Sequence, residues 1–252
     1  MAKYIEFVGV PGVGKSTTYE FLKTSYVKTS NWIPYEELCK NKYKYRKGIK
    51  EFLISFLINK IRPNALSKKG HDRIVLNKAI KKNPELIELF WQTIFKCENI
   101  NGEELRFYGV NYIRAILEKI QNIKEETSDK YCIVDEGLIH NINYFIPDAS
   151  VSQIELQVSK ILSLMDLPNA IIYFYGDAST IVKRTIERGS LRLRDKFLTP
   201  EELLKSRRKS IKEKSIYIDA VKSRNIPVLS LDTNDSLKNN SSRIISFING
   251  LG

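Results

Sequence analysis

The stretch Gly9-Val10-Pro11-Gly12-Val13-Gly14-Lys15-Ser16 matches the pattern GxxxxGK(S/T), and it lies in the context that the pattern requires. A short apolar run, residues 4–9, precedes it and predicts a buried strand, while the residues from 15 to about 26 predict a helix. Glycines let backbone N–H groups wrap around a phosphate, and the helix N-terminus adds positive potential. The order of strand, loop and helix therefore predicts an α/β fold with a phosphate-binding loop.

The residue types at the end of this loop indicate which ligand it takes. Lys15 is expected to reach the β- and γ-phosphates, Ser16 to offer its hydroxyl to Mg²⁺, and Thr17 to add a phosphate contact. The dinucleotide-binding pattern is excluded, because Lys15, Ser16 and Thr17 replace its third glycine. The sequence thus predicts a nucleoside triphosphate site. Its expected members are Gly9, Val10, Pro11, Gly12, Val13, Gly14, Lys15, Ser16 and Thr17.

The rest of the chain alternates between strand and helix patterns. Apolar runs at 31–35, 131–135, 170–175 and 226–231 predict further strands, and helical patterns follow or separate them. Two capping boxes are expected, Ser152 with Glu155 and Thr199 with Glu202. Continuous apolar strands that alternate with helices predict a three-layer α/β sandwich, with about five parallel strands covered by helices on both faces. With no repeat and no linker, residues 1–252 are expected to form one domain.

Composition excludes several classes of protein. The chain has 252 residues, of which 42% are hydrophobic and 28% charged, so it is not collagen-like, low-complexity or disordered. No uncharged apolar stretch approaches the roughly 18 residues of a membrane-spanning helix. Glu6 interrupts the place where a signal peptide needs an apolar run. We therefore expect a soluble, cytoplasmic protein.

The cysteines and histidines do not form a pattern typical of a metal or disulfide site. The three cysteines, at positions 39, 97 and 132, are odd in number and widely spaced. The two histidines, at positions 71 and 140, have no partner at ligand spacing. A metal held by histidine or cysteine is therefore not expected.

The positive charge is concentrated in one segment. Residues 40–82 contain 14 lysines and arginines against two acidic residues, which accounts for the whole net charge of +12. Such a segment raises the local concentration of anions. A lysine-rich face that only contacts water explains the same composition. The sequence leaves both interpretations open.

A second acidic element follows the predicted strand 131–135. Asp135, Glu136 and Gly137 come where that strand ends, and ligands of open α/β sheets gather at the carboxyl ends of the strands. Asp135 is therefore expected near the phosphates, where it holds Mg²⁺ or accepts the acceptor's proton. Glu136 is expected to orient an attacking group. A pair of helix-capping acids is the alternative.

A third cluster consists of arginines between residues 184 and 194. Arg184 and Arg188 are four residues apart and share a helix face, and Arg192 and Arg194 follow after Gly189. Several guanidinium groups from one helix end suit the charge of a transferring phosphoryl group. The alternative is a basic face in contact with water.

With these motifs, the chain resembles the P-loop kinases of nucleosides, nucleoside monophosphates and related small molecules, the thymidylate and deoxynucleoside kinases in particular. The resemblance implies a lid at about residues 184–200, in which Arg188, Arg192 and Arg194 bind phosphate. It also implies that Arg184 stacks on the adenine of ATP and that Asp232 and Thr233 lie along that ring. Residues from about 40 to 125 would form the helical region that binds the acceptor.

The resemblance departs from the family pattern at one place and leaves the choice between two residues open at another. In this family the strand-end aspartate is often followed by arginine, whereas Glu136 follows Asp135 here. Deoxynucleoside kinases also carry a carboxylate after the second strand as the acceptor's base, and Glu36 or Glu37 matches that position. Both positions concern the acceptor rather than ATP.

We therefore expect an ATP-dependent phosphotransferase that uses Mg²⁺ and acts on a small, anionic acceptor similar to a nucleoside, a nucleotide or a sugar. Its expected catalytic residues are Lys15, Asp135, Glu136 and Arg188. A P-loop ATPase that acts as a switch or motor is the first alternative, with Glu136 polarising water. A nucleotide-gated module that binds nucleic acid, an anionic glycan or a membrane through residues 40–82 is the second. The sequence leaves open whether the chain forms a homodimer.

Overall fold

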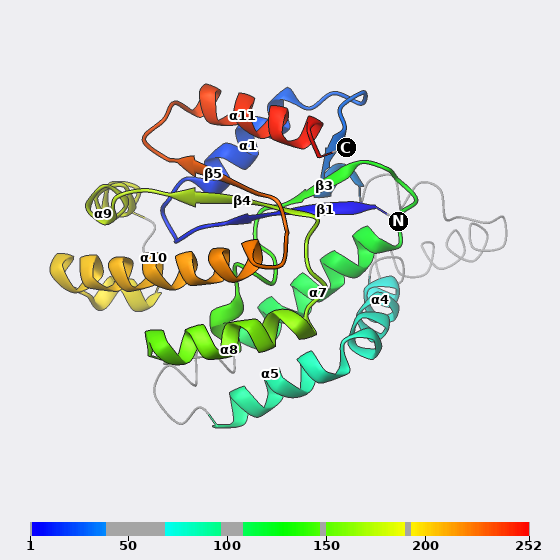
Figure 1. Ribbon diagram of the computed structural model, residues 1–252, viewed down its shortest axis with the longest axis horizontal. Coiled ribbons are helices and arrows are strands. Elements are labelled where there is room, and N and C mark those ends of the chain that lie inside the picture. Colours follow the sequence, from blue (N-terminus) through cyan, green and yellow to red (C-terminus); the bar gives the residue numbers. More distant parts are fainter. Residues whose placement is uncertain (1, 39–68, 97–107, 147–149, 190–192, 252) are drawn as a thin grey trace, which may run out of the picture.

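The computed structural model describes residues 2–38, 69–96, 108–146, 150–189 and 193–251. Within them, the five strands form one parallel sheet in the order β2-β3-β1-β4-β5 (Figure 1). The strands are β1 (Lys3–Val8), β2 (Trp32–Pro34), β3 (Tyr131–Val134), β4 (Ala170–Tyr175) and β5 (Val228–Asp232). The expected parallel sheet of about five strands is confirmed.

Helices cover both faces of this sheet, as Figure 1 shows. The helices α1 (Lys15–Ser25) and α11 (Leu237–Asn249) lie on one face. The other face carries α7 (Val110–Lys124), α8 (Val151–Leu164) and α10 (Pro200–Lys222). The described residues also form the helices α4 (Lys69–Lys82), α5 (Pro84–Lys96) and α9 (Ala178–Glu187). Helix α4 packs on α7, α5 on α8, and α9 on α10. The predicted three-layer α/β sandwich is confirmed.

The central strand β1 contributes to two hydrophobic cores. Ile5 and Phe7 pack into the core under α1 and α11, whereas Tyr4 and Val8 belong to the core under α7, α8 and α10. This alternation follows from the two-residue period of a strand, and burial on both faces is typical of parallel sheets. Glu6 has the register of Tyr4 and Val8, and its side chain is fully buried.

The two predicted capping boxes have different outcomes. At α10 the box is confirmed: the Glu202 amide donates to the Thr199 hydroxyl (3.3 Å), and the Thr199 amide donates to the Glu202 carboxylate (2.8 Å). At α8 the prediction is wrong, because the box lies two residues earlier, at Ser150 and Gln153. Ser150 keeps the extended backbone that a capping residue needs, with φ −67° and ψ 162°, whereas Ser152 already lies within the helix.

Part of the predicted basic segment and lid lies outside the described residues. Of segment 40–82, the structure describes only residues 69–82, and of the expected lid it leaves out residues 190–192, Arg192 among them. None of the described helices has the length and apolar character needed to cross a lipid bilayer.

Candidate functional site

The glycine-rich loop connects β1 to α1 through two residues in the left-handed region. Gly12 has φ +85° and Gly14 has φ +102°. A Cβ atom on Gly12 would lie 2.2 Å from the hydroxyl oxygen of Thr185, which itself donates to the carbonyl of Ile181 (2.7 Å). The loop therefore packs directly against α9, and both its conformation and this close approach require glycine at position 12.

Gly12→Ala is expected to lower the free energy of unfolding by roughly 1–3 kcal/mol, the usual cost of a residue held in a strained backbone conformation. The matched control is Gly250→Ala, where φ is −86° and the nearest atoms to an added Cβ are 3.5 Å away. That change is expected to stay within about 0.5 kcal/mol. Urea unfolding of the wild type, Gly12→Ala and Gly250→Ala measures both changes in the free energy of unfolding. Equal stability of the two variants would contradict the conformation of the loop.

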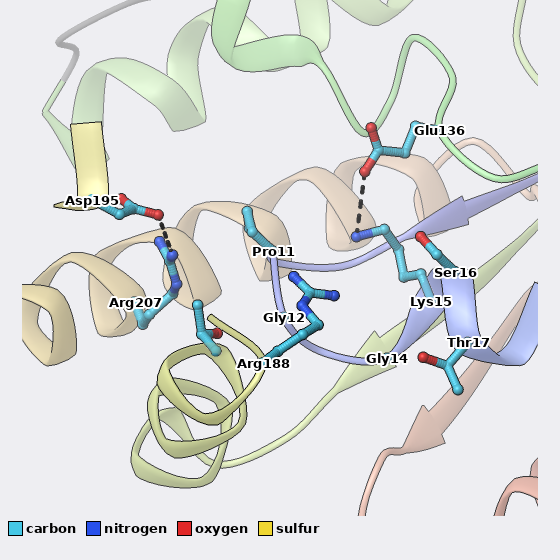
Figure 2. Close-up of a pocket in the computed structure, with 11 residues that line it drawn as sticks. Pro11, Gly12, Gly14, Lys15, Ser16, Thr17, Glu136, Arg188, Asp195 and Arg207 are labelled. Atoms are coloured by element: carbon cyan, nitrogen blue, oxygen red, sulfur yellow. Dashed lines mark hydrogen bonds and ion pairs between the residues drawn. The ribbon is translucent and has the colours of Figure 1, made fainter. Parts of the chain in front are cut away.

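Lys15 lies folded back along this loop. Its side chain is buried, and the Nζ atom donates to the carbonyl oxygens of Gly9 (3.0 Å) and Val10 (3.3 Å). The same atom lies 3.7 Å from Oε1 of Glu136, as the dashed line in Figure 2 marks. The loop lysine therefore faces Glu136, the acid predicted at the end of β3.

Ser16 and Asp135 meet although 119 residues separate them, because β3 lies next to β1 in the sheet. The Ser16 hydroxyl donates to Oδ2 of Asp135 over 3.0 Å. Burial raises the pKa of Asp135 above its ordinary value, and the Ser16 hydrogen bond opposes that rise. Glu136 beside it raises the pKa further.

The side chains of Ser16 and Asp135 are suitable ligands for a magnesium ion. Oδ1 of Asp135 is buried and has no hydrogen-bond partner among the residues that the structure describes. Mg²⁺ takes oxygen ligands at about 2.0–2.1 Å in an octahedron, so adjacent ligand oxygens are about 2.9 Å apart. The 3.0 Å between the Ser16 and Asp135 oxygens matches that spacing. The donor set is therefore suitable for the predicted metal.

The residues after β3 do not begin a helix. Residues 135–141 form bends and turns, and a short 3-10 helix (Ile142–Tyr144) follows only later. Glu136 is about one third exposed, and its Oε1 atom lies 3.3 Å from Nε2 of the buried His140. The interpretation of Asp135 and Glu136 as helix-capping acids is therefore excluded.

A polar cavity of about 120 Å³ lies in front of the glycine-rich loop (Figure 2). The predicted residues that line it are Pro11, Gly12, Gly14, Lys15, Ser16, Thr17, Glu136 and Arg188. Three further residues line it that the sequence did not predict, Thr185, Asp195 and Arg207. Val13, in contrast, packs into the core under α1 and α11.

Among these three residues, Arg207 forms a buried ion pair next to the cavity. Its guanidinium donates to Asp195 over 2.6 Å, and both side chains are only 1% exposed (Figure 2). Its Nε atom is buried without a hydrogen-bond partner in the described parts of the chain. In the sequence, Arg207 stands among other basic residues of a long polar helix, so only the tertiary structure distinguishes it from its neighbours.

The predicted adenine-binding residues lie together at the ends of α9 and β5. The guanidinium of Arg184 donates to the carbonyl of Thr233 over 3.2 Å. Asp232 ends β5, and its carboxylate accepts the amide of Asn234 (2.8 Å). The side chain of Arg194 lies outside the described part of the structure, as does the whole of Arg192.

Glu36 and Glu37, the two candidates for an acceptor base, follow β2. Glu36 accepts a hydrogen bond from the Tyr19 hydroxyl (2.7 Å) and lies 3.7 Å from the Nζ atom of Lys23. Glu37 is half-buried. Glu36 is therefore held at the end of β2 by Tyr19 and Lys23.

The sheet order and the GxxxxGK(S/T) loop between β1 and α1 define an α/β protein of the P-loop class. No protein-family model and no curated protein matches the chain. Solved structures that are similar to it include deoxyadenosine kinase from M. mycoides with bound dCTP (TM-score 0.47, 13% identity) and the same enzyme with the products dCMP and a flexible dCDP (0.48, 13%). A third holds bound dATP (0.47, 14%). Each similarity covers 98% of this chain and 99% of the other.

Proposed function

We propose that the chain is an ATP-dependent phosphotransferase that moves the γ-phosphoryl group to a small-molecule acceptor. The observation that carries this proposal is the pair of contacts between the loop and the end of β3, Ser16 with Asp135 and Lys15 with Glu136. Arg188 and Arg207 line the same cavity. Cations and carboxylates around one small polar space suit a transferring phosphoryl group, whose charge must be stabilised while a nucleophile is oriented.

Each residue has a role in this proposal. Lys15 contacts the β- and γ-phosphates, and Ser16 and Asp135 hold Mg²⁺, which when bound neutralises phosphate charge. An acceptor hydroxyl attacks the γ-phosphorus, the bond to the β-phosphate oxygen breaks, and ADP leaves. The hydroxyl proton passes to a carboxylate at the end of β3, either Asp135 or Glu136. Arg188 contacts the phosphoryl oxygens as their charge shifts.

Hydrolysis of ATP by a switch or motor is the second candidate function. It is favoured by Glu136, which lines the cavity and is exposed enough to orient a water molecule. The two functions differ in what accepts the phosphoryl group. They also differ in what they require of the arginines around the cavity.

Arg188→Ala is expected to separate these two functions. Arg188 ends α9 next to the cavity, and we expect it to contact phosphate mainly as the site closes. Its loss should lower kcat by about 10²-fold or more, and ATP affinity by much less, because the lost contact belongs to the transition state. Steady-state kinetics and nucleotide titration measure the two effects. Rapid acceptor-independent hydrolysis that needs Glu136 and ignores Arg188 would favour the ATPase instead.

We further propose that the acceptor is anionic and similar to a nucleoside, a nucleotide or a sugar. The support is the basic segment 40–82, of which the described end includes the exposed Lys81 and Lys82 on α4. A positive surface raises the local concentration of anionic substrates. Contact of this segment with nucleic acid or a membrane remains the alternative.

The test is release of ADP from ATP and Mg²⁺ in the presence of separate panels of nucleosides, nucleotides, phosphorylated sugars and anionic polymers. A phosphotransferase releases ADP faster with its acceptor present, and the acceptor gains phosphate, which mass spectrometry detects. ADP release at one rate with every panel, and no phosphorylated product, would reject the transfer reaction. Failure of the chain to bind any nucleoside triphosphate would reject the site itself.

A further inference from the structure

The turn after β3 is folded around a buried carboxylate. Glu6 on β1 is fully buried, and its two oxygens accept the backbone amides of His140 (2.6 Å) and Ile139 (3.3 Å). The backbone amide of Gly137 also lowers the pKa of this carboxyl. A Cβ atom on residue 137 would lie 2.4 Å from Oε2 of Glu6, so glycine is needed for this approach. The backbone of the turn thus depends on one carboxylate from the neighbouring strand.

A buried cation holds the same turn through a carbonyl group. Lys214 on α10 is 6% exposed, and its Nζ atom donates to the carbonyl oxygen of His140. Its Nζ atom also lies 4.8 Å from the centre of the Tyr217 ring. His140 is therefore fixed at both ends of its backbone, by Glu6 at its amide and by Lys214 at its carbonyl. Its imidazole lies against Glu136.

Burial of the charged forms of Glu6 and Lys214 is unfavourable. Burial raises the pKa of Glu6 to about 7, against the effect of the backbone amides. Burial, followed by the charge of Lys15, lowers the pKa of Lys214 to about 7. Apolar residues of similar size often stabilise a fold as well as buried charges do, so burial of this kind is weak support for a role in stability. A role in positioning explains why charged groups stand here.

We propose that Lys214 and Glu6 are positioning residues that hold the turn at 137–140, so that Asp135 and Glu136 face Ser16 and Lys15. This inference rests on the proposed phosphoryl transfer and adds to it the residues that set its geometry. Asp135 and Glu136 directly precede the turn. Because the Ser16–Asp135 hydrogen bond is 3.0 Å long, a shift of the turn by less than that distance would move both acids away from the glycine-rich loop.

The helix that carries Lys214 also carries Arg207, seven residues earlier. Seven residues are about two turns of an α-helix, so the two buried side chains share one face of α10. Arg207 reaches the phosphate cavity and Lys214 reaches the turn after β3. Helix α10 therefore contacts both the cavity and the turn, and it fixes their positions relative to each other.

The test compares Lys214→Met with Lys212→Met, which makes the same change at an exposed position of the same helix. Methionine keeps much of the length of lysine and removes the charge, so the fold is expected to remain. In Lys214→Met, the amides of Ile139 and His140 should exchange with solvent about 10- to 100-fold faster, since a hydrogen bond to a charged group is lost from their turn. Hydrogen exchange followed by NMR needs no substrate.

The kinetic readout separates positioning from a general loss of structure. Lys214→Met should lower kcat by about 10- to 100-fold, the usual effect of losing a group that orients a catalytic ligand. The Mg²⁺ concentration for half-maximal turnover should rise, while the KM for ATP should change little. Glu6→Gln should show the same pattern, because the amide nitrogen of glutamine cannot accept a backbone N–H. Lys212→Met should match the wild type throughout.

Two results would overturn the inference. One is unchanged exchange of the Ile139 and His140 amides in a folded Lys214→Met chain. The other is a wild-type kcat and Mg²⁺ requirement in both Lys214→Met and Glu6→Gln. Absence of phosphoryl transfer in the wild-type protein would reject the proposed function. In that case, hydrogen exchange of the Ile139 and His140 amides would alone test whether Lys214 holds the turn.

Discussion

Lys15→Ala is expected to lower ATP turnover by about 10²–10³-fold or more, the typical effect of removing a charge that stabilises a transition state. The loop spacing keeps Lys15 beside the cavity, where its Nζ atom already faces Glu136 and two loop carbonyls. Nucleotide binding should weaken as well, because the same charge attracts the phosphates. Steady-state turnover and nucleotide titration measure both effects.

The control for this variant is Lys28→Ala, which removes an exposed lysine of the same type. Lys15 also donates two hydrogen bonds to the loop, so urea unfolding must show that the variant remains folded. A well-folded Lys15→Ala chain with full turnover would remove the basis for assigning the loop to a nucleoside triphosphate.

Asp135→Asn is expected to lower the Mg²⁺ affinity of the site by about 10- to 100-fold, which raises the Mg²⁺ concentration needed for half-maximal turnover, and to reduce turnover more than nucleotide binding. Asparagine keeps the shape of the side chain and can still accept the Ser16 hydroxyl, but it loses the charge that binds the metal. The measurement is turnover as a function of Mg²⁺ concentration, with Asp129→Asn as the control at an exposed aspartate.

The stability of this variant gives an independent check. Burial raises the pKa of Asp135 in the fold, so its contribution to stability is present at low pH and is lost as pH rises through the folded-state pKa. At pH 7 the asparagine chain should therefore unfold at an equal or higher urea concentration than the wild type. Full Mg²⁺-dependent turnover of Asp135→Asn would mean that Asp135 serves only the structure of the turn.

The fold could be predicted from local patterns because its elements are encoded by neighbouring residues. Apolar runs of four to six residues correspond to β1, β3 and β4, and the Thr199–Glu202 box begins α10 where expected. The error at α8 arose because two overlapping serine patterns satisfy the same rule. The backbone conformation of Ser150, which local pattern does not specify, decides between them.

The candidate site could be predicted only in part, because local patterns identify only those residues whose role depends on their neighbours along the chain. The glycine-rich loop is a continuous stretch whose geometry follows from its own glycines and the helix behind it, so its residues were identifiable. Asp135 and Glu136 were identifiable because parallel strands end at one edge of a sheet. Arg207, Asp195 and Lys214 were not, since nothing distinguishes them from the solvated charges of a polar helix or loop.

By itself, then, the sequence determined the class of fold and the candidate site residues in the glycine-rich loop and at the end of β3. Such features depend on hydrogen bonds and packing between residues that are close along the chain. Only the tertiary structure decided that Ser16 meets Asp135, that Arg207 joins the cavity, and that Glu6 and Lys214 hold the turn after β3. These contacts depend on strand order and on the burial of particular charges, and both arise when distant segments pack together.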